Sequence, residues 1–155
     1  MLKKLFAILL TLSMLFTTAV LLAACASSDG IPKEVKKTFQ KYMDGCANDL
    51  HEAAKVVLFT DDAERVSFED DAPIPGTYKV LEWRKISDSL WAVEWENPDE
   101  ADSSKQHTCW SFVILIDGQY YVARGLAEIP RAMRDTFDME PYMPTGDHML
   151  PAFSD

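Results

Sequence analysis

Hydrophobic residues recur with a step of three or four between Val35 and Leu58, and charged residues fill most of the other positions. This spacing is that of an amphipathic helix with one apolar face. Pro32 suits the first turn of such a helix, and Gly45 can divide it into two shorter ones. We therefore predict one long helix that starts at Pro32 and ends before Thr60.

After residue 62 the hydrophobic and polar residues alternate, which is typical of β-strands. The candidate strands are residues 65–69, 77–86, 90–96, 107–116 and 119–125. Loops rich in proline, glycine or acidic residues separate several of them, and a last short helix is expected over 129–137. The pattern predicts an antiparallel meander of four or five strands.

The clearest hairpin turns at Asp117-Gly118. Both residues tolerate positive φ, as a two-residue type I′ turn requires. The turn fixes the register, so that Ser111 lies opposite Arg124 on one face of the sheet. Both faces are apolar near the turn, and the face with Ser111 and Arg124 becomes polar toward its far end.

A helix followed by an antiparallel meander predicts the α+β class, with the apolar stripe of the helix packed on one face of the sheet. The order of elements over 32–126, with the ending Ile116-Asp117-Gly118-Gln119-Tyr120-Tyr121-Val122, resembles the cystatin-like, cone-shaped fold of the nuclear-transport-factor-2-like superfamily. The resemblance implies a pocket between the helix and a concave sheet. A plain cystatin-type sheet is the near alternative.

The first residues form a separate pattern. Lys3 and Lys4 are followed by a run without charge from Leu5 to Ala24. A basic start, an apolar run and a small-residue end are the marks of a secretory signal peptide. Because the run is also about long enough to cross a bilayer, an uncleaved membrane anchor is the alternative.

Leu22-Ala23-Ala24-Cys25 stands at the end of that run and resembles the bacterial lipoprotein box. The resemblance implies that Cys25 carries a diacylglyceryl group and that the chain is cut just before it. The protein would then be held on the extracytoplasmic face of the cell membrane or of an outer membrane.

The chain is therefore expected to have four parts. They are a signal peptide at 1–24, a lipidated cysteine and tether at 25–31, one α+β domain at 32–137 and an irregular tail at 138–155.

Cleavage would remove two lysines and no acidic residue, which leaves 13 basic against 25 acidic residues, a net charge of −12. Nucleic acids and anionic lipid headgroups repel a domain with this charge as a whole. We therefore expect no nucleic-acid partner and no insertion of the domain into the membrane.

Cys46 and Cys109 remain once Cys25 is lipidated. Two thiols outside the cytoplasm can pair, and this pair would join the helix to the sheet. The alternative is two small buried apolar residues, and the sequence leaves both open.

Small-molecule pockets are often lined by a few polar residues on an otherwise apolar strand face. The candidates are Trp83, Glu94, Ser111 and Arg124, with Arg124 as the anchor for an anion. The alternative is that Arg124 pairs with a neighbouring strand acid such as Glu94 on a solvated patch. We favour it because strand arginines of antiparallel sheets are mostly surface residues.

Sequence motifs for catalysis are absent. The three histidines, His51, His107 and His148, belong to no readable triad, and the chain has no P-loop, GxSxG, HExxH or CxxC motif. We therefore predict no enzyme, no cofactor and no metal.

The expected function is that of a membrane-anchored, non-enzymatic binding or interaction domain for an envelope protein or a small solute. The alternatives are a small-molecule enzyme of the cone fold and a structural lipoprotein of envelope assembly.

Overall fold

The computed structural model describes residues 30–99, 102 and 104–143. The predicted signal peptide, Cys25 and the tail from residue 144, with His148, lie outside the described residues. The chain divides into two units, 1–33 and 34–155, and the fold below is that of the second. Within the described ranges no helix is both long and apolar enough to cross a bilayer.

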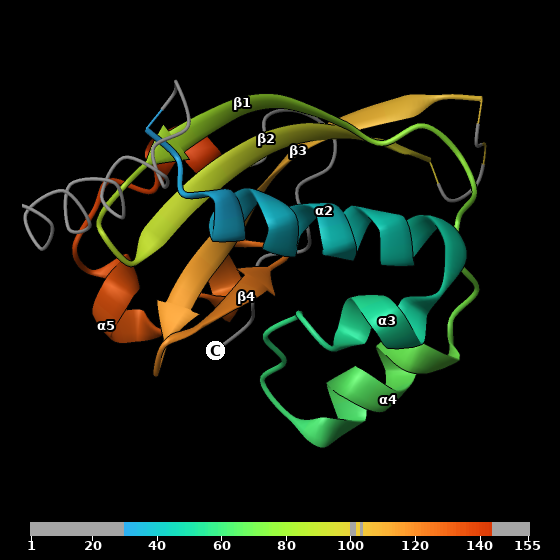
Figure 1. The fold of residues 1–155 in the computed structure, drawn as a ribbon, viewed down its shortest axis with the longest axis horizontal. Helices are drawn as coiled ribbons and strands as arrows, with labels where there is room; N and C mark the ends of the chain where they lie inside the picture. The colour runs from blue at the N-terminus through green and yellow to red at the C-terminus, as the bar shows by residue number, and fades with distance from the viewer. Residues whose placement is uncertain (1–29, 100–101, 103, 144–155) are drawn as a thin grey trace, which may run out of the picture. The chain divides into compact units, whose positions relative to one another are not determined.

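Four antiparallel strands form one sheet, in the order β1-β2-β3-β4 (Figure 1). Their bounds are β1 Lys79–Lys85, β2 Leu90–Pro98, β3 Gln106–Ile116 and β4 Gln119–Ala123. Together with the helices the sheet makes an α+β fold, which confirms the predicted class.

The β3–β4 hairpin has the predicted register, with Val113 opposite Val122. Asp117 and Gly118 at the turn have φ of 50° and 80°. Both values lie in the left-handed region that a type I′ turn requires. The turn dipeptide therefore sets which residues of β3 and β4 share a face.

The predicted long helix is two helices in the structure, α2 Lys33–Asn48 and α3 Leu50–Ala54. The chain turns at Asp49, whose side chain accepts a hydrogen bond from the backbone N–H of His51 and so caps α3. Gly45 permits the turn, because a Cβ at this position would lie 2.5 Å from the backbone nitrogen of Ala53. The glycine thus allows α3 to fold back on α2 rather than kinking α2 itself.

The candidate strand at 65–69 is wrong, because these residues belong to helix α4, Asp62–Asp70. Asp61 caps this helix by accepting a hydrogen bond from the backbone N–H of Glu64. The side chain of Glu64 in turn accepts from the backbone N–H of Thr60. This exchange of hydrogen bonds is a variant of the capping box and favours a helix. The segment is too short for the spacing of its hydrophobic residues to distinguish helix from strand.

α2 packs on one face of the sheet through aromatic rings. The ring centroid of Phe39 lies 5.7 Å from that of Trp83 and 5.4 Å from that of Trp95, with nearly perpendicular planes. Tyr42, one turn further along α2, lies 5.8 Å from Trp95. Such edge-to-face contacts add to the burial of large apolar surface, and Phe39 is fully buried. We call this side of the sheet the α2 face.

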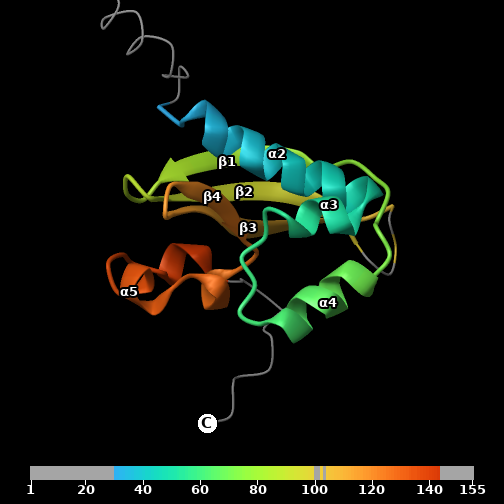
Figure 2. The same ribbon diagram turned by 60° about the horizontal axis from the view of Figure 1, so that its bottom comes forward.

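The opposite side, which we call the C-terminal face, has its own apolar cluster. Its buried members are Leu90, Ala92, Phe112, Ile114, Ala123 and Ile129. Short helices cover them in place of the helix predicted over 129–137: η1 Leu126–Glu128, α5 Arg131–Arg134 and η2 Glu140–Tyr142. Figure 2 shows α2 and α5 on opposite sides of the sheet.

Tyr142 contributes to this second cluster, although the sequence places it in the irregular tail. Its ring centroid lies 5.0 Å from that of Trp110 and 5.5 Å from that of Phe112. The chain between residues 138 and 142 is therefore part of the packing on the C-terminal face.

The edge of the sheet at β4 is covered by the chain after α3. Val57 forms a parallel bridge with Val122. The backbone N–H of Val122 donates to Val56 (2.6 Å), and the N–H of Leu58 donates to Val122 (2.8 Å). The sequence predicts helix for these residues, but here they satisfy the backbone groups of an edge strand.

Candidate functional site

Three of the four predicted pocket residues share the α2 face, and the fourth does not. Trp83 pairs with Val93 across β1 and β2, and Val93 pairs with Ser111 across β2 and β3. The register of the last hairpin puts Arg124 beside Ser111. Glu94 is the next residue of β2 after Val93, so it points to the C-terminal face and cannot join the other three.

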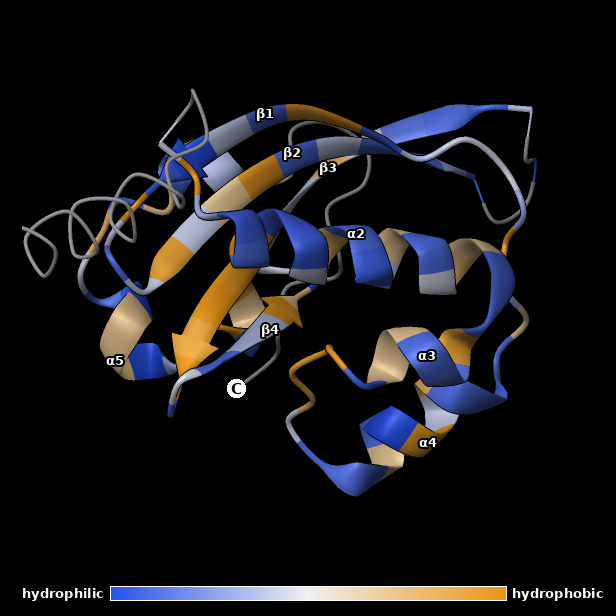
Figure 3. Ribbon diagram, in the orientation of Figure 1, coloured by the Kyte–Doolittle hydropathy of each residue, from blue (hydrophilic) through white to orange (hydrophobic). Residues whose placement is uncertain are grey.

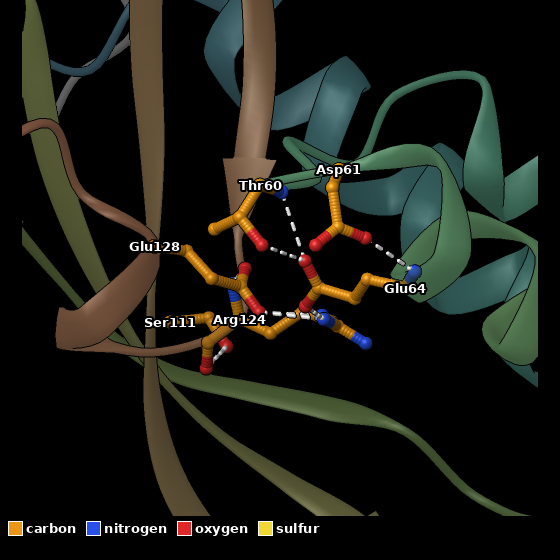
Figure 4. Close-up of polar contacts among 6 residues, drawn as sticks. All are labelled: Thr60, Asp61, Glu64, Ser111, Arg124 and Glu128. Atoms are coloured by element: carbon orange, nitrogen blue, oxygen red, sulfur yellow. Dashed lines mark hydrogen bonds and ion pairs between the residues drawn. The ribbon is translucent and has the colours of Figure 1, made fainter.

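The side chain of Arg124 is held by two acids (Figure 4). Its Nε donates to Oε1 of Glu128 at 2.7 Å, and its Nη2 donates to Oε1 of Glu64. The guanidinium carbon also lies 5.5 Å from the ring centroid of Phe59 and 5.3 Å from that of Phe68. Arg124 is ion-paired, but not with a strand acid on a solvated patch as we favour. Its partners lie in α4 and η1, its side chain is 27% exposed, and Glu94 lies on the other face.

Backbone contacts fix both acids in place. Glu128 lies in η1, four residues after Arg124, and also accepts a hydrogen bond of 2.6 Å from the backbone N–H of Arg124. Glu64 lies in the first turn of α4 and accepts from both the N–H (2.8 Å) and the hydroxyl (2.7 Å) of Thr60. We call Arg124, Glu64 and Glu128 the clasp, because they join the end of β4 to α4 and η1.

The environment moves the two carboxyl groups of the clasp in opposite directions. The hydrogen bonds from Thr60 lower the pKa of Glu64 below its usual value, and Arg124 lowers it further. Burial raises the pKa of Glu128, against the effect of its hydrogen bonds to Arg124. One guanidinium thus meets two carboxyl groups, of which Glu128 takes up a proton more readily.

Ser111 is buried and also fully engaged. The indole Nε1 of Trp95 donates to its hydroxyl at 3.0 Å, and the hydroxyl donates to the backbone carbonyl of Arg124 at 3.2 Å. These contacts connect β2, β3 and the end of β4 beneath α2. With Arg124 and Ser111 both occupied by partners from the chain itself, the arrangement is a structural network rather than an open anion site.

Cys46 and Cys109 are both free thiols, on α2 and β3. Burial raises the pKa of each to about 11, so that neither thiol is activated as a nucleophile. The side-chain amide of Asn97 donates to the sulfur of Cys109 at 3.7 Å. The disulfide stays a prediction for the oxidised protein.

The two described histidines each lie near one acid. His51 Nδ1 lies 3.5 Å from a carboxylate oxygen of Glu69, and His107 Nε2 is hydrogen-bonded to Asp99. In the part of the chain that the structure describes, no three His, Cys, Asp or Glu residues gather as a metal would need.

A shallow, open depression of about 560 Å³ lies between α2 and α3, a feature that the sequence analysis missed. The residues that line it carry both charges, with Lys37, Lys41, Asp44 and Glu52 among them. A signal for it exists in the sequence, since Lys37, Lys41 and Asp44 follow one another at helical spacing on the side of α2 away from the sheet.

Sequence reasoning also missed Glu64 and Glu128. Both had a signal: Asp61 and Glu64 have the spacing of a capping box, and Arg124 and Glu128 are four residues apart.

No protein-family model matches this chain, and no curated protein compared with it is significantly similar.

Proposed function

We propose that this protein is a bacterial lipoprotein, anchored through Cys25 on the extracytoplasmic face of a membrane, whose single domain binds a partner without catalysis. The observation that carries the proposal is the order of elements along the chain. A basic start and a charge-free run end at Leu22-Ala23-Ala24-Cys25, and the first helix of the folded domain begins only eight residues later, at Lys33.

The anchor is sufficient on physical grounds. Each buried methylene contributes about 0.8 kcal/mol to membrane binding, and one acyl chain alone gives only marginal attachment. A diacylglyceryl group carries two chains, so that attachment through Cys25 would last. The domain itself then needs no apolar surface for the membrane.

Two observations favour binding over catalysis. The guanidinium of Arg124 and the hydroxyl of Ser111, the polar groups that a pocket would use, have their partners within the chain. The buried thiols have raised pKa values, which is the opposite of what a catalytic cysteine needs. A partner would then meet the outer surface of the domain.

We further propose that the helix and sheet form a cystatin-like cone. The support is the packing of α2 across one face of a four-stranded antiparallel meander. The covering of the other face by residues 126–142 is an addition to that plan. Fold likeness of this kind indicates architecture and says little about activity.

The anchor is tested by expressing the full chain in a bacterial host and weighing its N-terminal peptide. We expect a mature protein that starts at Cys25 and carries a diacylglyceryl group, and a Cys25→Ala variant that keeps its 24 residues as an unprocessed precursor. Cys46→Ala is the matched control and should be processed normally. A Cys25→Ala protein that is cut at the same bond and released would contradict the proposal.

The binding role is tested on the lipoprotein extracted from its own envelope in mild detergent. Native mass spectrometry should show the chain with a bound protein or solute that is lost on denaturation. A bare chain, together with turnover of small molecules in the same extract, would favour an enzyme instead.

A further inference from the structure

The charge of the mature protein is unevenly distributed. Residues 33–41, the first part of α2, contain four lysines and one acid, a net charge of +3. Because the mature chain has a net charge of −12, the remainder carries −15. The four lysines are Lys33, Lys36, Lys37 and Lys41. The sequence-level expectation that lipid headgroups repel the whole domain does not apply to this segment.

Helix stability does not account for this arrangement. The backbone of a helix is positive at its N-terminal end and favours acids there and basic residues at the other end. α2 has the reverse order, with Glu34 as the one acid of its first turn and no basic residue in its last. Lys33 and Lys36, which lie in the first turn, therefore oppose the dipole of the helix that carries them.

The lysines point away from the sheet. Lys33, Lys37 and Lys41 follow one another at steps of four, which places them in one row along the helix. The buried side chains of α2, among them Phe39 and Tyr42, lie on the opposite side. Figure 3 shows hydrophilic turns along the exposed side of α2. We call this the lysine row, with Lys36 at its flank.

The ion pairs of Lys37 and Lys41 are exposed to solvent. Lys37 lies 3.9 Å from Glu34, with side chains 79% and 66% exposed, and Lys41 lies 3.8 Å from Glu52, with side chains 45% and 48% exposed. Exposed pairs of this kind hold their partners weakly and exchange readily.

The row also follows directly after the proposed anchor. Only residues 26–32 separate Cys25 from Lys33. A chain of this length spans at most about 28 Å when fully extended. The tether therefore allows the row to reach the headgroups, and a fixed charge that comes within about one Debye length of them, roughly 8 Å, interacts with them.

We propose that the lysine row of α2 lies on anionic phospholipid headgroups and turns the acidic remainder of the domain toward the aqueous side. This proposal rests on the lipid anchor proposed above. Each lysine that lies near an anionic membrane surface, next to a membrane anchor, raises the binding constant for that membrane about fivefold. Charge complementarity favours this surface, because the rest of the domain would be repelled by it.

The test uses the mature lipoprotein, added to preformed vesicles of phosphatidylcholine alone or with a share of phosphatidylglycerol. A water-soluble reagent acylates exposed amines, and mass spectrometry reads the rate for each lysine. We expect Lys33, Lys37 and Lys41 to react about threefold or more slowly on the anionic vesicles, and the difference to fade in high salt. Lys79 and Lys105, which are exposed elsewhere, should react equally on both.

Two variants sharpen the test. Replacing Lys33, Lys37 and Lys41 by Gln should abolish the protection of Lys36, which reports on the same surface. Replacing Lys55, Lys79 and Lys105 by Gln changes the charge equally and should leave the protection of the row intact.

Equal rates on the two kinds of vesicle would overturn the proposal. So would a loss of protection in the control variant as large as in the row variant. The anchor is judged separately in the same samples, by flotation with neutral vesicles and by the mass of the N-terminal peptide. If the protein floats with neutral vesicles but its lysines react at equal rates on both kinds of vesicle, the proposed lysine surface is refuted and the lipid anchor is not.

Discussion

Both faces of the sheet bury apolar side chains, and the α2 face adds a network of polar contacts to this burial. Beneath α2 the hydroxyl of Ser111 is 1% exposed and paired with Trp95, and the clasp of Arg124 lies at the edge of this layer. On the C-terminal face the buried cluster is entirely apolar, with Phe112 and Ile114 fully buried. Directed polar contacts fix one arrangement, whereas apolar burial contributes most of the free energy.

This difference predicts how the two faces respond to substitution. Loss of apolar volume should cost most where a large side chain is fully buried, as Phe112 is on the C-terminal face. Loss of a polar partner should matter on the α2 face, where each group left behind is buried without a partner.

Phe112→Ala should have the largest effect. The ring is fully buried and contacts Tyr142 and Phe137. We expect the free energy of unfolding to fall by about 3–5 kcal/mol, as measured by chemical denaturation. Segment 137–142 should also become more sensitive to proteolysis. Phe112→Leu, which keeps much of the volume, is the control and should lose less of both.

Arg124→Gln should come next, because it removes the one cation between two carboxylates. We expect a loss of about 2–4 kcal/mol at neutral pH, below the cost at a fully buried ion pair since the side chain is 27% exposed. Arg131→Gln is the matched control, as Arg131 pairs with Asp135 at 3.8 Å on an exposed surface. Equal losses in the two variants would show that the clasp is no more than a surface ion pair.

The sequence predicts the elements whose signals are local. Two-residue alternation with Asp117-Gly118 fixes the β3–β4 register, and helical spacing identifies α2. The sequence does not predict the face on which Glu94 lies, because no turn type fixes the registers of β1 with β2 and of β2 with β3. A shift of one residue reverses the face of a whole strand, and β1 carries such a shift between Val80 and Glu82.

The clasp could be anticipated only in part. Arg124 and Glu128 are close in sequence, but Glu64 lies 60 residues from Arg124. Their contact depends on α4, a segment whose short length hides its helical character. Pairs at that separation follow from tertiary packing, which no local pattern encodes.

Ser111→Ala should have a smaller effect than Arg124→Gln. It leaves the Nε1 of Trp95 without its acceptor in a residue that is 3% exposed. We expect a loss of about 1–2 kcal/mol in the free energy of unfolding. In a double-mutant cycle with Trp95→Phe, the losses of unfolding free energy in the two single variants should sum to more than the loss in the double variant. Additive losses would mean that the hydrogen bond contributes nothing specific.

Glu64→Gln should have the smallest effect and the clearest dependence on pH. Thr60 and Arg124 lower the pKa of Glu64. A carboxyl group with a lowered pKa in the folded state stabilises the protein above its unfolded pKa, about 4.3, and loses this contribution as the pH falls through the folded pKa. Wild type and variant should therefore differ by about 1 kcal/mol at neutral pH and converge on acidification.

Urea denaturation over a series of pH values measures this convergence. Glu140→Gln, at an exposed position in η2, should leave the whole curve unchanged and so serves as the control. If wild type and Glu64→Gln differed by the same amount at neutral and at acidic pH, the charge of Glu64 would contribute nothing to the clasp. The clasp would then depend on the pairing of Arg124 with Glu128 and on the contacts of its guanidinium with the rings of Phe59 and Phe68.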